Sequence, residues 1–261
     1  MEMRSEWHRD SPRTAFGCCI CAANLIGVLV PVLVFELLFW TCPSLRRRDL
    51  SGGAVPRPLP PAVQRGYWPW AVGTQLTVLV TSATAGDILA PRVDLAAPSV
   101  GRLLLEMFVL SVVSDFGLYW GHRLLHASAT LWTHVHSIHH RVPAPTARAV
   151  LYIHPVDTII QQGIPMILAA VITRPSLLSF YVFTLFHLAE TTFFHSGLDD
   201  SAALWQLVFL RLWLPFRAGA GHHDGHHRVS NHQGKTNNLG ETFVCWDAMF
   251  GTRIGGKRRT A

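Results

Sequence analysis

Histidines dominate the second half of this sequence. Fourteen of the fifteen histidines follow residue 121, and most lie in three short clusters with the spacings HxxxH, HxxHH and HxxHH. The clusters are His122-Arg-Leu-Leu-His126, His136-Ser-Ile-His139-His140 and His223-Asp-Gly-His226-His227. Neutral imidazole is the commonest metal ligand in proteins. Eight clustered histidines exceed what one mononuclear site can use, so the spacing predicts a site for two metal ions, assembled from several segments.

The spacing within each cluster predicts how the rings share the metals. Residues three or four apart lie on one face of a helix, so we expect His122 and His126 to bind one metal together. His136 and His139 are expected to reach the same centre, and His140 its neighbour. The third cluster repeats this arrangement from the C-terminal part of the chain.

One carboxylate is placed to support these ligands. Asp115 lies seven residues before His122, about two helical turns along the same face. Metal-bound histidines usually donate their second ring N–H to a carboxylate or a carbonyl oxygen. We therefore predict that Asp115 orients a histidine ligand without binding the metal itself.

The remaining histidines are mostly predicted to have other roles. An isolated imidazole is more often exposed or hydrogen-bonded than metal-bound, which applies to His8 and His232. His134 and His222 each stand beside a cluster, and non-ligand roles are favoured for both. His187 lies within an apolar stretch, and the sequence favours neither role for it.

The composition indicates a membrane protein. Of the 261 residues, 49% are hydrophobic and only 15% are charged, the mean hydropathy is +0.27, and nine residues are tryptophan. These values differ from those of an ordinary soluble enzyme. The net charge of +6 is not arranged as a basic stripe with aromatic residues, so nucleic acid is not expected as a partner. Among the five cysteines only Cys18 and Cys21 have CxxC spacing, and no second pair is present to complete a zinc site; the cysteines give no indication of disulfides.

Three apolar runs precede the histidine clusters. After a polar leader, residues 1–15, the runs cover about 16–40, 68–90 and 102–120. A helix needs roughly 20 apolar residues to cross the hydrocarbon core of a bilayer. Each run is therefore predicted to span the membrane.

A fourth apolar stretch, residues 159–190, is interrupted at Thr173-Arg174-Pro175. Each half holds only about 15 residues, so we expect a helical hairpin that dips into the membrane and returns. The predicted fold is an all-α, polytopic membrane helical bundle of about three spans and a hairpin, with a cytosolic histidine-rich cap that holds two metals. The predicted regions are a leader (1–15), an N-terminal transmembrane region (16–100), a catalytic domain (101–253) and a basic tail (254–261).

This topology places every histidine cluster on one face, together with the connection at residues 43–67. The connection carries five arginines and one aspartate, a net charge of about +4, whereas residues 1–15 carry three of each sign. Positively charged connections favour the cytoplasmic side. We therefore expect an integral membrane protein with a cytoplasmic metal site, in the endoplasmic reticulum membrane if the source is eukaryotic.

The clusters belong to a longer pattern that resembles a known family. It begins with Asp115-Phe-Gly-Leu-Tyr119-Trp120-Gly-His122 and continues through Pro143-Ala-Pro145, His154-Pro155, His195-Ser196-Gly197, Asn238-Leu-Gly240, Trp246-Asp247 and Phe250-Gly251-Thr252. Over residues 101–253 the chain resembles the fatty acid hydroxylase/sterol desaturase superfamily. The His-Pro and His-Ser-Gly pairs are more similar to its sterol oxidase branch.

The resemblance implies a membrane-bound non-heme di-iron oxygenase acting on a membrane lipid, a sterol or a fatty acyl chain. Such enzymes use dioxygen and electrons from NAD(P)H, relayed here by an external cytochrome-type donor and its reductase. It also implies a role for His154 as a ligand or a neighbour of one. The ligands that it implies are His122, His126, His136, His139, His140, His195, His223, His226 and His227.

The motifs leave other activities open. The same ligands would serve hydroxylation and desaturation, because both begin with hydrogen abstraction, and a fatty acyl hydroxylase would share them. A different class is a non-enzymatic membrane metal-binding protein, although polar residues lining a transmembrane route would then be expected. A zinc hydrolase would require a carboxylate base beside the histidines, and only Asp224 comes near.

Overall fold

The computed structural model describes residues 3–46, 59–89, 94–143, 145–201, 203–209, 214, 216–230 and 236–254. Within these residues the secondary structure is helical, apart from isolated β-bridges. The elements are α1 (Met3–Thr41), η1 (Pro43–Leu45), α2 (Pro61–Leu89), α3 (Val100–Ala127), α4 (Ala129–His134), η3 (His136–Arg141), η4 (Ala147–Leu151), α5 (Pro155–Thr158), η5 (Ile159–Gly163), α6 (Ile164–Thr173), α7 (Leu177–Phe194), α8 (Ala203–Val208), α9 (Ala220–Val229) and α10 (Cys245–Met249).

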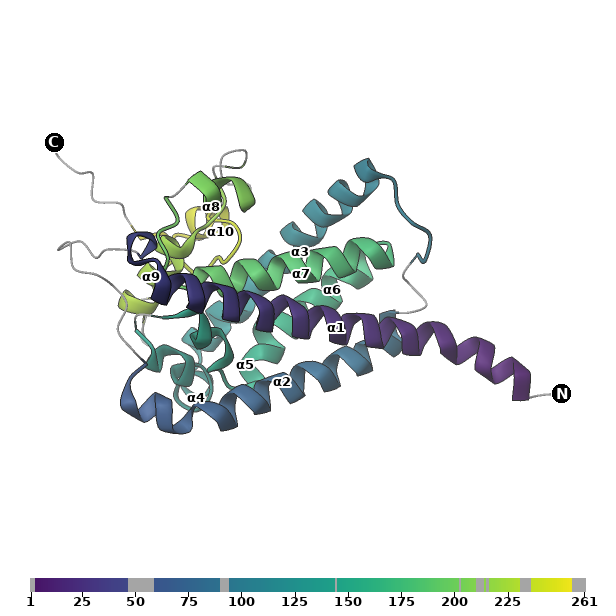
Figure 1. Ribbon diagram of the computed structural model, residues 1–261, viewed down its shortest axis with the longest axis horizontal. Helices are drawn as coiled ribbons and strands as arrows, with labels where there is room; N and C mark the ends of the chain where they lie inside the picture. Colours follow the sequence, from purple (N-terminus) through teal and green to yellow (C-terminus); the bar gives the residue numbers. More distant parts are fainter. Residues whose placement is uncertain are drawn as a thin grey trace.

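The long helices form a bundle with a cap of short helices at one end (Figure 1). Four helical stretches are long and apolar enough to cross a membrane: Gly17–Thr41, Val100–Ala127, Pro155–Thr173 and Leu177–Phe194. Their outer surface is apolar, with Leu33 71% and Leu104 61% exposed. Such a surface is stable in lipid but unfavourable in water. The prediction of an all-α, polytopic membrane bundle is confirmed.

The second predicted span differs from the expectation. The helix α2 contains 29 residues and begins at Pro61, but it is not among the four stretches that are apolar enough to cross. Polar side chains of α2 form hydrogen bonds inside the bundle. The Thr74 hydroxyl donates to the carbonyl oxygen of Ile153 at 2.7 Å, and the amide of Asn24 on α1 donates to the Ser82 hydroxyl at 3.1 Å. Thr74 and Ser82 lower the hydropathy of α2, and both find hydrogen-bond partners inside the bundle.

The hairpin is longer than predicted. Its first arm begins at Pro155 and comprises α5, η5 and α6, and the two arms contain 19 and 18 residues, so each is long enough to cross. The turn lies at the predicted break. Arg174 adopts a left-handed conformation (φ 48°), and the Ser176 side chain caps α7 by accepting from the backbone N–H of Ser179. The expectation that the hairpin dips in and returns therefore gives way to two candidate spans.

The two ends of the bundle have different contents. At one end the turn after α2 meets the turn between α6 and α7, because Asp94 pairs with Ser176. At the other end Arg46, which follows α1, pairs with Leu198, which follows α7. Figure 1 shows α4, α9 and α10 gathered at this second end, where α1 ends and α2 begins. The histidine clusters therefore lie at one end of the molecule.

Some predicted segments are only partly described. The helix α1 already begins at Met3, so it includes most of the segment predicted as a polar leader. Residues 47–58 of the basic connection lie outside the described residues. So do residues 255–261 of the predicted basic tail and His232.

Close contact between α3 and η5 positions the first histidine pair. Gly121 precedes His122, and a Cβ atom at Gly121 would lie 2.7 Å from the carbonyl oxygen of Ile160. Only glycine permits this approach of two backbones. The segment η5 is a π-helix, a feature that frequently occurs at functional sites.

Candidate metal centre

Nine histidines converge in two groups at the capped end of the bundle. In each group the ring nitrogens that could bind a metal lie within 4.8 Å of one another. The first group takes residues from α3, η3 and α9, and the second from η3, the end of α7 and α9. The first group is His122, His126, His136, His140 and His226, and the second is His139, His195, His223 and His227.

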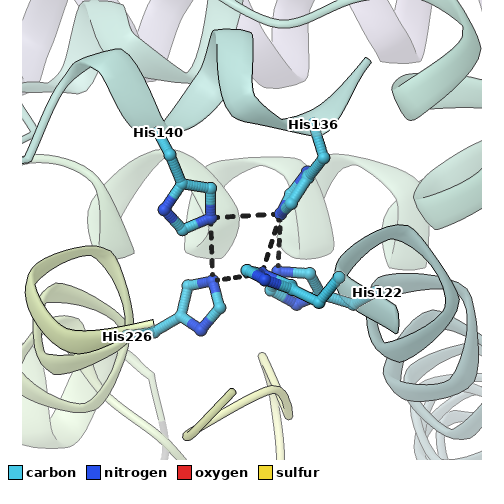
Figure 2. Close-up of side chains that lie close together, drawn as sticks. His122, His136, His140 and His226 are labelled. Atoms are coloured by element: carbon cyan, nitrogen blue, oxygen red, sulfur yellow. Dashed lines mark hydrogen bonds between the residues drawn. The ribbon is translucent and has the colours of Figure 1, made fainter. Parts of the chain in front are cut away.

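In the first group the Nε2 atoms of four histidines form a closed ring of contacts, and that of His122 joins the ring at His136 (Figure 2). The Nε2 atom of His136 lies 3.1 Å from the Nε2 atoms of His122, His126 and His140. The Nε2 atom of His226 lies 3.3 Å from that of His126 and 3.2 Å from that of His140. These contacts join a helix near the middle of the chain to one near its C-terminus.

The second group forms a chain of contacts. The Nε2 atom of His195 lies 3.1 Å from that of His139 and 2.9 Å from that of His223, which lies 3.1 Å from that of His227. The predicted distribution of the middle cluster was therefore wrong. His136 and His140, rather than His136 and His139, face His122. A 3₁₀ turn by itself would place His136 and His139 on one side, so the division follows from the segments packed against η3: α3 meets His136, whereas His195 at the end of α7 meets His139.

Hydrogen bonds orient several of these rings. In three of them the Nδ1 atom donates to a backbone carbonyl oxygen, which can only accept, so the Nε2 atom carries a lone pair. The pairs are His122 with Leu239 at 3.1 Å, His226 with Asn237 at 2.7 Å, and His195 with Thr191 at 2.8 Å.

The lone pairs indicate that these groups fit metal ions. The Nδ1 atom of His136 also donates, to the Asp157 carboxylate at 2.7 Å. His122 and His226, whose Nδ1 atoms both donate to carbonyl oxygens, turn unprotonated Nε2 atoms into the first group within 4.8 Å of each other, and two such atoms cannot share a hydrogen bond. A cation between them removes this repulsion. Imidazole sets of this kind suit iron, zinc and copper.

Burial keeps the rings in the form that binds metals. It lowers the pKa values of His139, His140, His223 and His227 well below the usual value, and neighbouring imidazoles lower them further. Neutral imidazole is the ligand form. The groups are therefore ready to bind a cation without first losing protons.

Asp157 is the carboxylate that supports a histidine, and the sequence reasoning did not identify it. The side chains of Asp157 and His136 are both fully buried, and the Gln161 amide donates to the second Asp157 oxygen. A signal was present in the sequence. A carboxylate inside an apolar stretch is unfavourable in lipid and marks a protein partner or a site.

Asp115 has a different role from the predicted one. Its carboxylate accepts from the backbone N–H groups of Thr242 (2.8 Å) and Phe243 (2.9 Å) and from the indole N–H of Trp246 (2.9 Å). Seven residues of helix rise about 10 Å, which separates Asp115 from the ring of His122. It therefore fastens the C-terminal segment to α3 instead of touching a histidine.

Asp247 fixes the turn at Leu239 and Gly240, next to the histidines. It accepts from the backbone N–H groups of Leu239 (2.7 Å) and Gly240 (3.0 Å) and from the Thr252 hydroxyl (2.7 Å). A Cβ atom at Gly240 would collide with the carbonyl oxygen of Phe243, so the turn is too tight for a side chain. This turn holds the Leu239 carbonyl that orients His122.

His154 is the one proposed ligand that the structure does not bring to either group. It precedes α5, where its Nδ1 atom accepts from the backbone N–H of Val156 at 3.1 Å. Its ring centroid lies 5.3 Å from that of Trp70. His154 acts as a helix cap, a role that the following proline favours.

The other histidines also lie outside the two groups. His187 is buried and bonds to the side-chain oxygen of Gln162 at 3.2 Å, and His222 bonds to Asp247 at 3.0 Å. His134 is exposed. The side chain of His8 is not described.

A narrow cavity extends from the two groups into the bundle. Its metal end is lined by His122, His139, His195 and His223, and its other end by apolar residues that include Leu89 and Phe180. Along α7 the distance from His195 to Phe180 is about 22 Å. The cavity volume is about 120 Å³.

The chain is similar to enzymes that act on lipids. It is 33% identical to very-long-chain aldehyde decarbonylase GL1-11 of Oryza sativa subsp. indica over 181 residues, 69% of this chain and 64% of the relative. It is 31% identical to methylsterol monooxygenase 2-2 of Arabidopsis thaliana over 183 residues, 70% of this chain and 65% of the relative. The chain thus spans less than two thirds of the length of either relative.

No solved structure matches the chain. A sequence model described as fatty acid hydroxylase matches residues 107–252, more than half of the chain and the region that contains all nine clustered histidines. The chain therefore belongs to the fatty acid hydroxylase family.

Proposed function

We propose that the protein is a membrane-bound non-heme di-iron oxidoreductase that hydroxylates or oxidises a C–H bond of a sterol or a related lipid. It would use dioxygen and electrons from NAD(P)H, delivered by an external cytochrome-type donor. The observation that carries the proposal is the position of the two all-histidine groups at one end of a cavity enclosed by apolar helices. The names of the relatives, a methylsterol monooxygenase and an aldehyde decarbonylase, support a lipid substrate.

The first and second groups would each hold one iron, and the donor set favours this metal pair. Imidazole binds Fe(II) well and leaves coordination positions open, whereas no cysteine lies in either group of the described residues. When bound, two irons would supply the electrons that activate dioxygen for attack on an unreactive C–H bond. Such a bond has no acidic proton, so acid–base residues alone would not suffice.

The chain's own residues perform the positioning. Leu239, Asn237 and Thr191 accept hydrogen bonds that hold three histidine rings in place. The apolar walls of the cavity exclude water and place a hydrocarbon segment beside the histidines. Because the surrounding helices are apolar outside as well, a lipid can reach the cavity from the bilayer.

Three other reactions remain candidates within this proposal. Desaturation, or hydroxylation of a fatty acyl chain, would use the same centre. Decarbonylation of a long-chain aldehyde is supported by the 33% identity to the rice decarbonylase. All of them predict a lipid product, which separates them from a non-enzymatic metal-binding protein.

Lipid mass spectrometry tests the proposal. Cells that express the full chain should accumulate a lipid absent from cells that express His139→Ala. A gain of one oxygen indicates hydroxylation, a loss of two hydrogens indicates desaturation, and a shortened hydrocarbon indicates an aldehyde substrate. Identical lipid profiles, with both proteins expressed equally and a suitable electron donor present, would refute an enzymatic role.

Metal analysis tests the di-iron centre separately. Protein from an iron-replete host should contain about two irons per chain, one for each histidine group. Retained activity with one zinc and no iron would contradict this assignment. Zinc can displace iron during overexpression, so the content is measured together with activity.

A further inference from the structure

The helix α8 belongs to an apolar stretch of the cap that the histidine chemistry leaves unexplained. Residues 202–216 contain only two polar side chains, Gln206 and Arg211. A helix needs roughly 20 apolar residues to cross a bilayer, so this stretch is too short to span it. Apolar stretches of this length occur in buried core helices and in segments that lie at a membrane surface. The two cases differ in whether protein covers the whole helix.

One face of α8 packs against the bundle. The ring centroid of Trp205 lies 5.9 Å from that of Phe35 on α1 and 5.1 Å from that of Phe193 on α7. Phe209, which follows α8, has its ring centroid 4.7 Å from that of Phe193 and 6.0 Å from that of Phe186. Trp205 and Phe209 are both buried in one apolar cluster with Phe35 and Phe193.

These contacts fix the depth of α8 relative to the candidate spans. Phe35 lies six residues before the end of α1 at Thr41, and Phe186 lies eight residues before the end of α7 at Phe194. At the rise of an α-helix, these positions are about 9 and 12 Å inside the ends of the two helices. The helix α8 therefore lies beside the last turns of α1 and α7 and not beyond them (Figure 1).

The opposite face of α8 is apolar and exposed. Leu204, Leu207 and Val208 are 58%, 54% and 45% exposed, and no charged residue occurs from 202 to 210. At the same level along α1, Leu37 is 62% exposed on the outer surface of a candidate span. The exposed face of α8 is thus level with a surface that is stable in lipid. In water such a face would be unfavourable.

We propose that α8 lies in the leaflet at the metal end, at the boundary between hydrocarbon and headgroups. Leu204, Leu207 and Val208 then contact the acyl chains of phospholipids. Because α8 connects His195 at the end of α7 to His223 on α9, this contact holds the second histidine group at the membrane surface. The inference depends on the membrane character of the bundle and not on the proposed reaction.

Labelling of the full wild-type chain in lipid nanodiscs tests the inference. One probe is a phospholipid with a diazirine group in its acyl chain, which is photolysed so that its adducts can be mapped by mass spectrometry. The other is hydroxyl radical generated in the water, whose oxidation of side chains is mapped in the same way. Leu204, Leu207 and Val208 should carry lipid adducts at a level similar to Leu33 and Leu104, and should be oxidised as little as those two leucines.

A charge on the exposed face should remove the lipid contact. Leu207→Asp introduces a carboxylate that is unfavourable among acyl chains, so lipid adducts on Leu204 and Val208 should decrease and their oxidation should increase. Thr133→Asp is the matched control, because Thr133 is exposed on α4 and the new charge should leave both values on α8 unchanged. Adducts on Leu104 provide an internal reference in each sample.

Three results would overturn the inference. Strong oxidation of α8 without lipid adducts in the wild type would show that water covers this face. Absence of both labels would show that protein covers it, such as a second copy of the chain. Unchanged labelling in a folded Leu207→Asp variant would show that the face does not depend on lipid. The wild-type measurement alone decides if Leu207→Asp does not fold.

Discussion

At the scale of single residues, the hydrogen bonds made by the histidine Nδ1 atoms decide where the Nε2 lone pairs point. Backbone carbonyl groups accept the Nδ1–H groups of His122 and His226, and this leaves the Nε2 lone pairs of both rings directed into the first group. In the first group the repulsion between the lone pairs of His122 and His226 favours a bound cation. The same residues would form an ordinary polar cluster if their tautomers were not fixed.

Replacing Asp157 should weaken the centre. Asp157→Asn removes the negative charge that strengthens His136 as a ligand, and loss of such a partner lowers metal affinity or activity by about 10- to 100-fold. Iron content and lipid oxidation measure the effect. Asp94→Asn is the control, because Asp94 lies at the opposite end of the bundle. Unchanged iron and activity in Asp157→Asn would contradict its role.

Histidine variants should separate ligands from neighbours. His139→Ala and His226→Ala each remove a ligand of one group, so both should abolish lipid oxidation and lower bound iron. His134→Ala should change neither, because His134 is exposed. His154→Ala should retain the iron and cost about 1 kcal/mol of stability as a lost helix cap. Loss of iron from His154→Ala would show that His154 is a metal ligand.

At the scale of elements, the centre depends on close packing between helices. The start of the sequence GHRLLH in α3 is held against η5 by a glycine that permits backbone contact. The cap is held against α3 by Asp115, which receives three hydrogen bonds from residues 242–246. Both contacts fix where the histidine-bearing segments meet.

A pair of glycine variants in α3 tests this packing. Gly121→Ala forces its Cβ atom to within 2.7 Å of the Ile160 carbonyl oxygen, so the free energy of unfolding should fall by about 1–3 kcal/mol and iron should be lost. Gly101→Ala meets open space, and the better helix propensity of alanine should leave stability equal or slightly higher. Thermal unfolding and iron content in detergent give both values. Equal stability of the two variants would show that the contact is unimportant.

At the scale of the whole molecule, the bundle keeps both histidine groups at one end. The connection at residues 43–67 begins at this end, because Arg46 pairs with Leu198 just after His195. Its net charge of about +4, from five arginines and one aspartate, favours the cytoplasmic side. We therefore propose that the metal end faces the cytoplasm.

Glycosylation mapping tests this orientation in a eukaryotic host. An acceptor sequence inserted near Ser51 should remain unmodified, because the connection would face the cytoplasm. An acceptor added before Met1 should be modified, since α1 would carry the N-terminus to the luminal side. Modification near Ser51 but not at the N-terminus would invert the proposed topology.

The sequence by itself determined the helical class, the membrane character, the break at Thr173-Arg174-Pro175 and the histidines of the three clusters. These features depend on local composition and on spacing along one segment, which helix geometry converts directly into position. The resemblance added His195, which lies far from any cluster. It also added His154, which the structure places outside both groups.

Only the tertiary structure decided how the histidines divide between two groups and what orients them. His136 and His139 are three residues apart, yet they face different groups because η3 lies between α3 and α9. Asp157 reaches His136, whereas Asp115 faces the cap. Such pairings depend on the packing of segments that are distant in sequence. Spacing within a helix carries no information about which surface the opposing segment will present.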